Sequence, residues 1–191
     1  MNSMLRQALR EFSGPLNQLI VNCSGKEGDS WWKEFMKFLR KEPCWVDNII
    51  CVDRIVPLYP EWVEKPLFPE LEKTEPSEYG IVQIKEWFHQ DQKRGPAKGF
   101  AILEYLKSQN ILKSCAGLSD LLAIEAKGID FFLKHFAGKA VFGWQSVVQR
   151  RDGDLFVPYL VEHGEGVVLG WRWLELDWDS RGPALYFASI S

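Results

Sequence analysis

The stretch KAVFGWQSVVQRRDGDLFVPYLVEHGEG, residues 139–166, carries the clearest structural signal in this chain of 191 residues. Apolar residues alternate with other residues on both sides of the central RDGD, and a period of two indicates β-strands. Asp152 and Gly153 suit the two positive φ values of a type I′ turn. We therefore predict a β-hairpin in which Arg151 faces Asp154.

Two more strands are predicted after this hairpin. VVLGWRWLELDW (167–178) alternates as far as Leu174, where the parity of its apolar positions changes, and ALYFASIS (184–191) follows a turn. A bulge or a strand end near Leu174 would explain the change of parity. Pro158 cannot donate a ladder hydrogen bond, so it must lie at a bulge or point its nitrogen away from a neighbouring strand. We therefore predict a C-terminal antiparallel β-meander of about four strands.

Three segments upstream of the hairpin have the helical apolar period. They are GFAILEYLKSQN (99–110), LSDLLAIEAKG (118–128), which Ser119 can cap, and IDFFLKHFAGK (129–139). Because helices come before strands, the predicted fold class is α+β, with helices covering one face of the sheet.

The N-terminal half is predicted to combine helices with an irregular, proline-rich segment. DSWWKEFMKFLRKEP (29–43) is amphipathic, and residues 1–14 form a second, shorter amphipathic helix. VDNIICVDRIVPLY (46–59) has the β-branched composition of a strand. The prolines and acidic residues of 64–80 exclude a regular helix or a central strand. Its apolar residues favour an ordered loop or lid over a free linker.

The segment QDQKRGPAKG (90–99) is the best candidate for a domain boundary, because it is polar and is broken by Gly95 and Pro96. We expect residues 1–95 to form an N-terminal α/β region of unknown type. Residues 96–191 then hold the helices and the C-terminal antiparallel sheet. The two regions could also form one continuous domain.

Aromatic residues make up 14 % of the chain and include nine tryptophans, which either fill a bulky core or line a partner surface. The net charge of −3 argues against a general nucleic-acid-binding protein. Lys93, Arg94 and Lys98 could still contact phosphate, so weak nucleic-acid binding stays an alternative. No apolar run reaches the length of a membrane span, and no membrane partner is expected.

The spacing of cysteines and histidines predicts no metal site. The four cysteines, Cys23, Cys44, Cys51 and Cys115, contain no CxxC pair, and the three histidines form no HxxxH pair. Structural zinc sites need such pairs. Since no export signal is found, we expect reduced thiols and a cytoplasmic location.

No catalytic motif is found, so no catalytic residue and no cofactor are predicted. The chain has no GxGxxG, no GxxxxGK[ST] and no GxSxG. An enzyme with a site between the two halves stays an alternative, in which His89, Asp91 or Cys115 would react. Cys115 is more simply explained as a buried, inert thiol.

The stretch GWRWLELDWDSRGP (170–183) holds three tryptophans in eight residues. Strand alternation places Trp171 and Trp173 in the core beside Trp144. Trp178 follows the change of parity, so we expect it in a loop beside a sheet edge. An exposed tryptophan among charged residues is typical of a binding surface.

We therefore predict a binding site in which Arg172, Asp177 and Asp179 surround Trp178 at its rim. If this prediction holds, Arg172 and Trp178 can be replaced by alanine without loss of the fold. In the alternative interpretation, Asp177 or Asp179 accepts backbone N–H bonds in its own turn and pairs with Arg172 or Arg181.

The C-terminal part also resembles a family of uncharacterised bacterial proteins. The residues that carry the resemblance are VPYL (157–160), WRWL (171–174) and PALYFAS (183–189). The resemblance covers roughly the last 70 residues, which include FFLKHFAGK (131–139), and it could extend to the helix GFAILEYLKSQN (99–110) before them. It implies a shared fold unit and a bacterial origin, and it implies no activity.

The leading functional hypothesis is a non-catalytic, cytoplasmic protein that binds another macromolecule, with a protein partner suspected. It rests on the lack of catalytic motifs and on the excess of aromatic residues, which are enriched at protein interfaces. The sequence leaves the oligomeric state open.

Overall fold

The structure, a computed structural model, describes residues 17–25, 28–41, 48–54, 59–73 and 76–187. The chain divides into two compact units, Met1–Val46 and Asp47–Ser191. Both sides of the 95/96 division lie in the second unit, and that division as a domain boundary stays a prediction. The predicted helix over residues 1–14 lies outside the described residues.

The first unit contains two helices in its described part, over residues 17–24 and in α2, Gly28–Leu39. α2 confirms the amphipathic helix predicted from the sequence. After Leu39 the Arg40 N–H donates to the Lys37 carbonyl (3.0 Å), a hydrogen bond of the tighter turn that follows the helix. Trp32 on its apolar side remains 55 % exposed, so this face is only partly covered.

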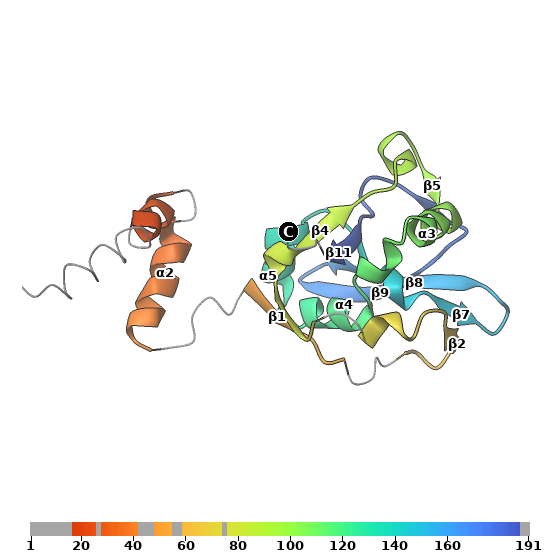
Figure 1. Ribbon diagram of the computed structural model, residues 1–191, viewed down its shortest axis with the longest axis horizontal. Helices are drawn as coiled ribbons and strands as arrows, with labels where there is room; N and C mark the ends of the chain where they lie inside the picture. The colour runs from red at the N-terminus through yellow and green to blue at the C-terminus, as the bar shows by residue number, and fades with distance from the viewer. Residues whose placement is uncertain (1–16, 26–27, 42–47, 55–58, 74–75, 188–191) are drawn as a thin grey trace, which may run out of the picture. The chain divides into compact units, whose positions relative to one another are not determined.

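The second unit is built on a mixed, seven-stranded sheet whose centre is the predicted hairpin. Three consecutive strands pair antiparallel: β7 (Val148–Arg150), β8 (Leu155–His163) and β9 (Gly166–Trp173) (Figure 1). β9 pairs with one edge of β8. Both β7 and β6 (Val141–Phe142) pair with its other edge, one after the other along the strand. β8 is therefore the central strand of the unit.

The turn between β7 and β8 differs from the prediction. The Arg150 N–H donates to the Asp154 carbonyl (2.9 Å), so Arg150 faces Asp154 in place of Arg151. Gly153 has a φ of +94°, whereas Asp152 has no positive φ. A three-residue loop that ends in a left-handed glycine therefore closes the hairpin, which is the second common way to join two such strands.

The predicted four-stranded meander is not confirmed. β11 (Ala184–Phe187) does not follow β9 in the sheet but lies between β6, with which it is parallel, and β4 (Ile84–Trp87), with which it is antiparallel. The strand order is β2-β7-β8-β6-β11-β4, with β9 on the free side of β8 and β2 (Val63–Pro66) at one edge. The sequence shows a strand at 184–187, but its partners are distant in the chain.

Between β9 and β11 the chain leaves the sheet. β9 ends at Trp173 and Leu174 is fully buried, which agrees with the predicted strand end. The short strand β10 (Asp177–Trp178) then pairs with β5 (Ala97–Lys98), directly before helix α3. This excursion carries Trp178 across one face of the sheet.

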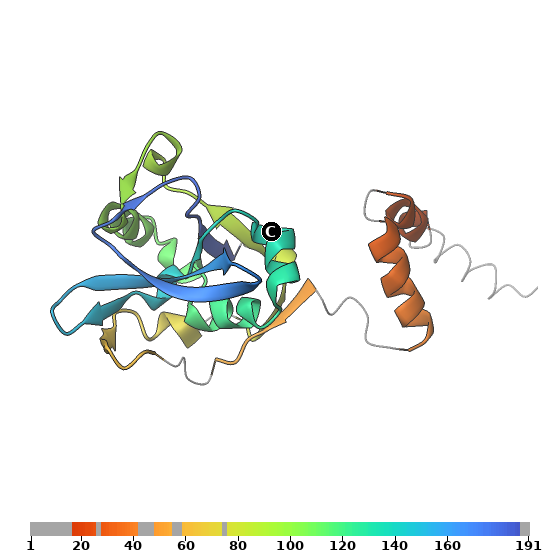
Figure 2. The same cartoon turned by 180° about the vertical axis from the view of Figure 1, so that it is seen from behind.

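The hairpin of β8 and β9 is covered on both faces, whereas one covered face was predicted. Leu160 packs with α4 (Leu118–Glu125) and α5 (Ile129–Phe136), and Val157 packs with α3 (Gly99–Ser108). Figure 1 shows α3 and α4 on opposite sides of this hairpin, and Figure 2 shows the hairpin from behind as a long blue ribbon. All three predicted helices are confirmed.

Pro158 lies beside a break between β6 and β7. A 3₁₀ turn at Trp144–Ser146 separates these two strands, and the Pro158 carbonyl accepts the Gly143 N–H (3.0 Å) at the start of the break. In an antiparallel strand the N–H and C=O of one residue point to the same neighbour. The nitrogen of Pro158 therefore faces the irregularity, as its sequence position required.

The proline-rich segment is ordered where it is described, and it lies at sheet edges. It contains the edge strand β2, a 3₁₀ turn at Leu71–Lys73, and β3 (Glu78–Gly80). β3 pairs with β1 (Ile49–Cys51), which is the strand that forms within the predicted stretch 46–59. No central strand lies in the described part of this segment, as predicted.

Candidate functional site

A pocket of about 220 Å³ lies where the chain segment after β9 crosses the sheet. It is lined by β6 with the turn before it, by the paired strands β8 and β9, and by β10 with the turn that leads from it to β11. We call it the Trp178 pocket, and its lining residues are Gly138, Lys139, Ala140, Phe142, Val161, Arg172, Trp178, Asp179, Arg181 and Gly182. It thus gathers Arg172, Trp178 and Asp179 of the four predicted binding residues.

Trp178 forms an inner wall of the pocket and not its rim. Its side chain is only 2 % exposed, and its ring lies 4.1 Å from that of Phe142 and 5.1 Å from that of Trp144, centre to centre. The expected position in an exposed loop is therefore wrong, and an alanine at this position would leave a large cavity. The cause is β10, whose pairing with β5 turns the side chain of Trp178 inward.

Gly99, the first residue of α3, makes room for this ring. A Cβ atom at Gly99 would come within 2.7 Å of the Leu174 carbonyl oxygen and 2.8 Å of the Trp178 Nε1. The Nε1 edge of the ring thus points toward α3, whereas its Cε3 edge lies near Gly182 at the pocket. The pocket therefore meets the hydrocarbon edge of the indole.

Arg172 projects from β9 over Trp178. Its Cζ atom lies 5.3 Å from the centre of the indole ring, which is the distance of a cation–π contact. Its Nη2 donates to the Asp177 backbone carbonyl, and its buried Nε has no hydrogen-bond partner among the described residues. The guanidinium thus brings a positive charge to the pocket, whereas its unpartnered Nε is enclosed by protein atoms.

Asp179 and Arg181 form a closed unit at the mouth of the pocket. One Asp179 oxygen accepts the Arg181 backbone N–H (2.8 Å), and the other accepts the Arg181 Nε (3.1 Å) and Nη2 (2.7 Å). These hydrogen bonds hold the pKa of Asp179 below its usual value. The turn-capping interpretation of Asp179 is therefore confirmed, although the residue also lines the pocket.

Asp177 lies outside the pocket. Its carboxylate pairs with the Lys98 Nζ (2.9 Å) across β10 and β5. Lys139, which the sequence did not indicate, does line the pocket, where its Nζ donates to both carboxylate oxygens of Glu86 (2.7 and 2.8 Å). No local pattern marks Lys139, because 33 residues separate it from Arg172.

Trp171 and Trp173 lie on the other face of β9, away from the pocket. Trp171 contacts Trp62 edge to face at 5.4 Å, and Trp173 is 36 % exposed. The prediction that both pack in the core beside Trp144 is wrong. Strand alternation places Trp171 and Trp173 on the same face of β9. Since both faces of the hairpin are covered, it does not show which of the two faces contacts Trp144.

A second group of polar side chains is buried between the proline-rich segment and α4. Glu72, only 4 % exposed, accepts hydrogen bonds from the hydroxyls of Tyr59 and Ser146. Burial raises the pKa of Glu72, and it raises that of Tyr59 together with the adjacent carboxylate. No local sequence pattern indicates this cluster, because acidic residues in an irregular segment such as 64–80 are usually solvated.

Asp120 completes this buried cluster. Its carboxylate, fully buried, accepts the Arg54 Nη2 (2.7 Å), the Tyr79 hydroxyl (3.1 Å) and the Gly117 N–H (2.8 Å). The last of these bonds caps α4, a role that the sequence had given to Ser119. The cluster ties the edge segments to the core, and its carboxylates are shielded from solvent.

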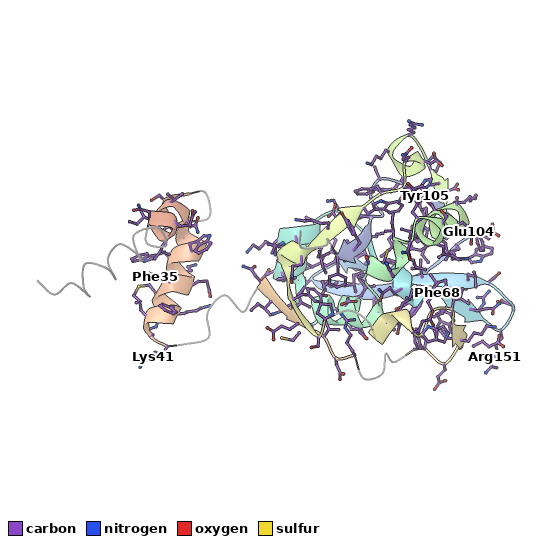
Figure 3. All side chains as sticks on the ribbon, viewed as in Figure 1. Phe35, Lys41, Phe68, Glu104, Tyr105 and Arg151 are labelled. Carbon is purple, nitrogen blue, oxygen red and sulfur yellow. The ribbon has the colours of Figure 1, made fainter. Side chains whose placement is uncertain are left out.

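Of the three candidates for catalysis, only the sequence neighbours His89 and Asp91 are in contact, with 3.5 Å between the His89 Nδ1 and an Asp91 carboxylate oxygen. His89 packs against Tyr105 on α3, and its Nδ1 accepts the Asp91 N–H (3.2 Å); Figure 3 labels Tyr105. Cys115 is fully buried, with its Sγ 3.6 Å from the Ile111 carbonyl oxygen. None of the three candidates lines the Trp178 pocket.

In the part of the chain that the structure describes, no group of three or more histidine, cysteine or acidic side chains is placed to hold a metal ion. No helix of that part combines the length and the apolar character that a membrane crossing demands. Cys23 and Cys51 are free thiols.

Comparisons with protein-family models, with curated proteins and with solved structures find no match to this chain. The resemblance of the C-terminal segment to a bacterial family stays a prediction.

Proposed function

We propose that this protein is a non-catalytic binding module that holds a protein partner at the Trp178 pocket. The observation that carries the proposal is the Arg172 guanidinium, which lies over an aromatic wall and has no carboxylate partner among the described residues. Arginine and tryptophan are the residues most often found at the energetic centres of interfaces. A partner group that pairs with this cation would gain a partly desolvated, charge-assisted contact.

The size of the pocket supports a protein partner over a cofactor. Sites that enclose drug-sized ligands measure roughly 300–1,000 Å³, and the Trp178 pocket is smaller, at about 220 Å³. It has room for one side chain or a chain end of a partner. The surrounding surface would supply the remaining contact area that a stable interface needs.

Two alternatives have less support. An enzyme with a site between the two halves would need His89, Asp91 or Cys115 in a shared cleft, and Cys115 lies in the core. Nucleic-acid binding through 93–98 would draw on Lys98, which is paired with Asp177. The cytoplasmic location and the bacterial origin stay predictions and belong to this proposal.

Affinity capture with the tagged full chain tests the proposal. The wild-type protein should retain a stoichiometric protein from an extract of its own cells, and Arg172→Gln should lose it. Arg151→Gln is the matched control, because Arg151 is an exposed arginine at the tip of the β7–β8 hairpin, outside the pocket (Figure 3). Equal retention by Arg172→Gln and the wild type would contradict the proposal, provided that both melt at similar temperatures.

A further inference from the structure

We infer that the Trp178 pocket takes the C-terminal carboxylate of a partner chain whose last residue has an apolar side chain. This inference rests on the proposed function and names the chemistry of its ligand. It follows from the charge, the apolar wall and the size of the pocket, taken together.

The charge of the pocket selects an anion. Three cationic side chains, Lys139, Arg172 and Arg181, line it with one carboxylate, Asp179. Lys139 forms a salt bridge with Glu86, and Arg181 forms one with Asp179. The shortest nitrogen–oxygen distance is 2.7 Å in each pair. Arg172 alone among these cations forms no direct salt bridge in the described part of the chain, although its charge also lowers the pKa of Asp179. A bound anion would give Arg172 a direct partner.

The shape of the Arg172 side chain favours a carboxylate. A guanidinium offers a planar array of N–H groups that matches the two oxygens of a carboxylate. The contact of Arg172 with the Trp178 ring fixes this plane in advance, which lowers the ordering cost of binding. A phosphate dianion would meet stronger repulsion from Asp179, which stays ionised because its hydrogen bonds with Arg181 lower its pKa.

The apolar wall favours a chain end over an acidic side chain. Phe142, Val161 and the hydrocarbon edge of Trp178 give the pocket an apolar wall beside its charged side chains. The side chain of an aspartate or glutamate ends in its carboxylate and brings no further group to this wall. A C-terminal leucine or valine brings a carboxylate and an aliphatic side chain on one Cα atom, and both fit within about 220 Å³.

The test uses the full chain and four small probes, followed by ¹H–¹⁵N NMR of the indole and guanidinium groups. N-acetyl-leucine carries both features, N-acetyl-leucine amide lacks the charge, acetate lacks the side chain, and inorganic phosphate offers a dianion. A single-residue ligand should bind with a Kd of about 1 mM or weaker. N-acetyl-leucine should bind roughly tenfold tighter than the other three, as expected for one charge-assisted hydrogen-bonded pair.

Variants link the binding to the pocket. Arg172→Gln should lower the affinity for N-acetyl-leucine by roughly tenfold or more, and Arg172→Lys should lower it by an intermediate amount. Arg151→Gln should bind N-acetyl-leucine with the affinity of the wild type. Equal binding of the acid and the amide, tighter binding of phosphate, or no binding of the acid at several times the expected Kd would overturn the inference. Capture of a partner that depends on Arg172 would survive these outcomes, so failure of this inference and failure of the proposed function are distinguishable.

Discussion

The guanidinium carbon of Arg172 lies 5.3 Å from the centre of the Trp178 ring, although Arg172 belongs to β9 of the sheet and Trp178 to β10, after the chain has left it. The indole is buried and structural, whereas Arg172 is half-buried and brings a positive charge to the pocket. One residue therefore shapes the pocket and the other supplies its charge.

Removal of the Trp178 side chain should destabilise the fold. Because the ring is 2 % exposed and packs on Phe142 and Trp144, Trp178→Ala should lower the free energy of unfolding by about 3–5 kcal/mol. Denaturant unfolding measures this loss. Trp173→Ala, at a residue 36 % exposed, should cost clearly less, and equal losses for the two variants would argue against the buried position of Trp178.

The first residue of α3 should tolerate no side chain. In Gly99→Ala the new methyl group would meet the Leu174 carbonyl and the Trp178 Nε1 at less than 3 Å, so backbone or indole must shift. We expect a loss of about 1–3 kcal/mol and a changed tryptophan fluorescence spectrum. Gly95→Ala is the control, since nothing lies within 4 Å of its added methyl group, and matching effects of the two variants would refute the close approach.

Local patterns in the sequence predicted most helices and strands of the second unit. They did not predict how strands that are distant in the chain pair in the sheet. The helices α3, α4 and α5 follow the apolar period, and β8 with β9 follows the period of two. The partners of β11 are β4 and β6, and no short-range signal specifies such pairings. The predicted covering of a single face failed for the same reason, because both halves of the chain contribute to the two cores.

For the candidate site, the sequence predicted several of the residues but not their orientation. Arg172, Trp178 and Asp179 stood out because charged residues interrupt a run of tryptophans, and all three line the pocket. The sequence could not show that Trp178 faces inward, since that depends on the pairing of β10 with β5. It gave no sign of Lys139, because the fold alone brings that residue to the pocket.

The buried acid Glu72 should make stability depend on pH. Burial raises its pKa above the ordinary value of 4.5, so the folded state holds the proton more tightly than the unfolded state. The stabilisation from this group is complete below the ordinary pKa and is lost as the pH rises through the raised value. Denaturant unfolding across a pH series should show this decline.

Glu72→Gln isolates that contribution. The variant cannot ionise, so its stability relative to the wild type should increase as the pH rises from below 4.5. A difference between the two proteins that is constant with pH would contradict the raised pKa of Glu72. The comparison removes the effects of all other titrating groups that the two proteins share.

The buried ion pair of Arg54 and Asp120 should matter far more than an exposed one. Because Asp120 is fully buried, Arg54→Met should cost about 3–5 kcal/mol by leaving an uncompensated charge. Lys107→Met breaks the exposed pair with Glu104 and should cost less than about 1 kcal/mol. Chemical denaturation of both variants compares them, and similar small losses would mean that Asp120 finds other compensation.

Site-specific photo-crosslinking tests the central claim, that a protein partner binds at the Trp178 pocket, most directly. A photoreactive phenylalanine analogue would replace Ser180, which is exposed between the pocket-lining residues Asp179 and Arg181, or Val82, which is 74 % exposed and does not line the pocket. We predict one discrete crosslinked protein from position 180 in extracts of the native cells, and none from position 82. Crosslinking from position 82 alone, or from neither position, would contradict the account.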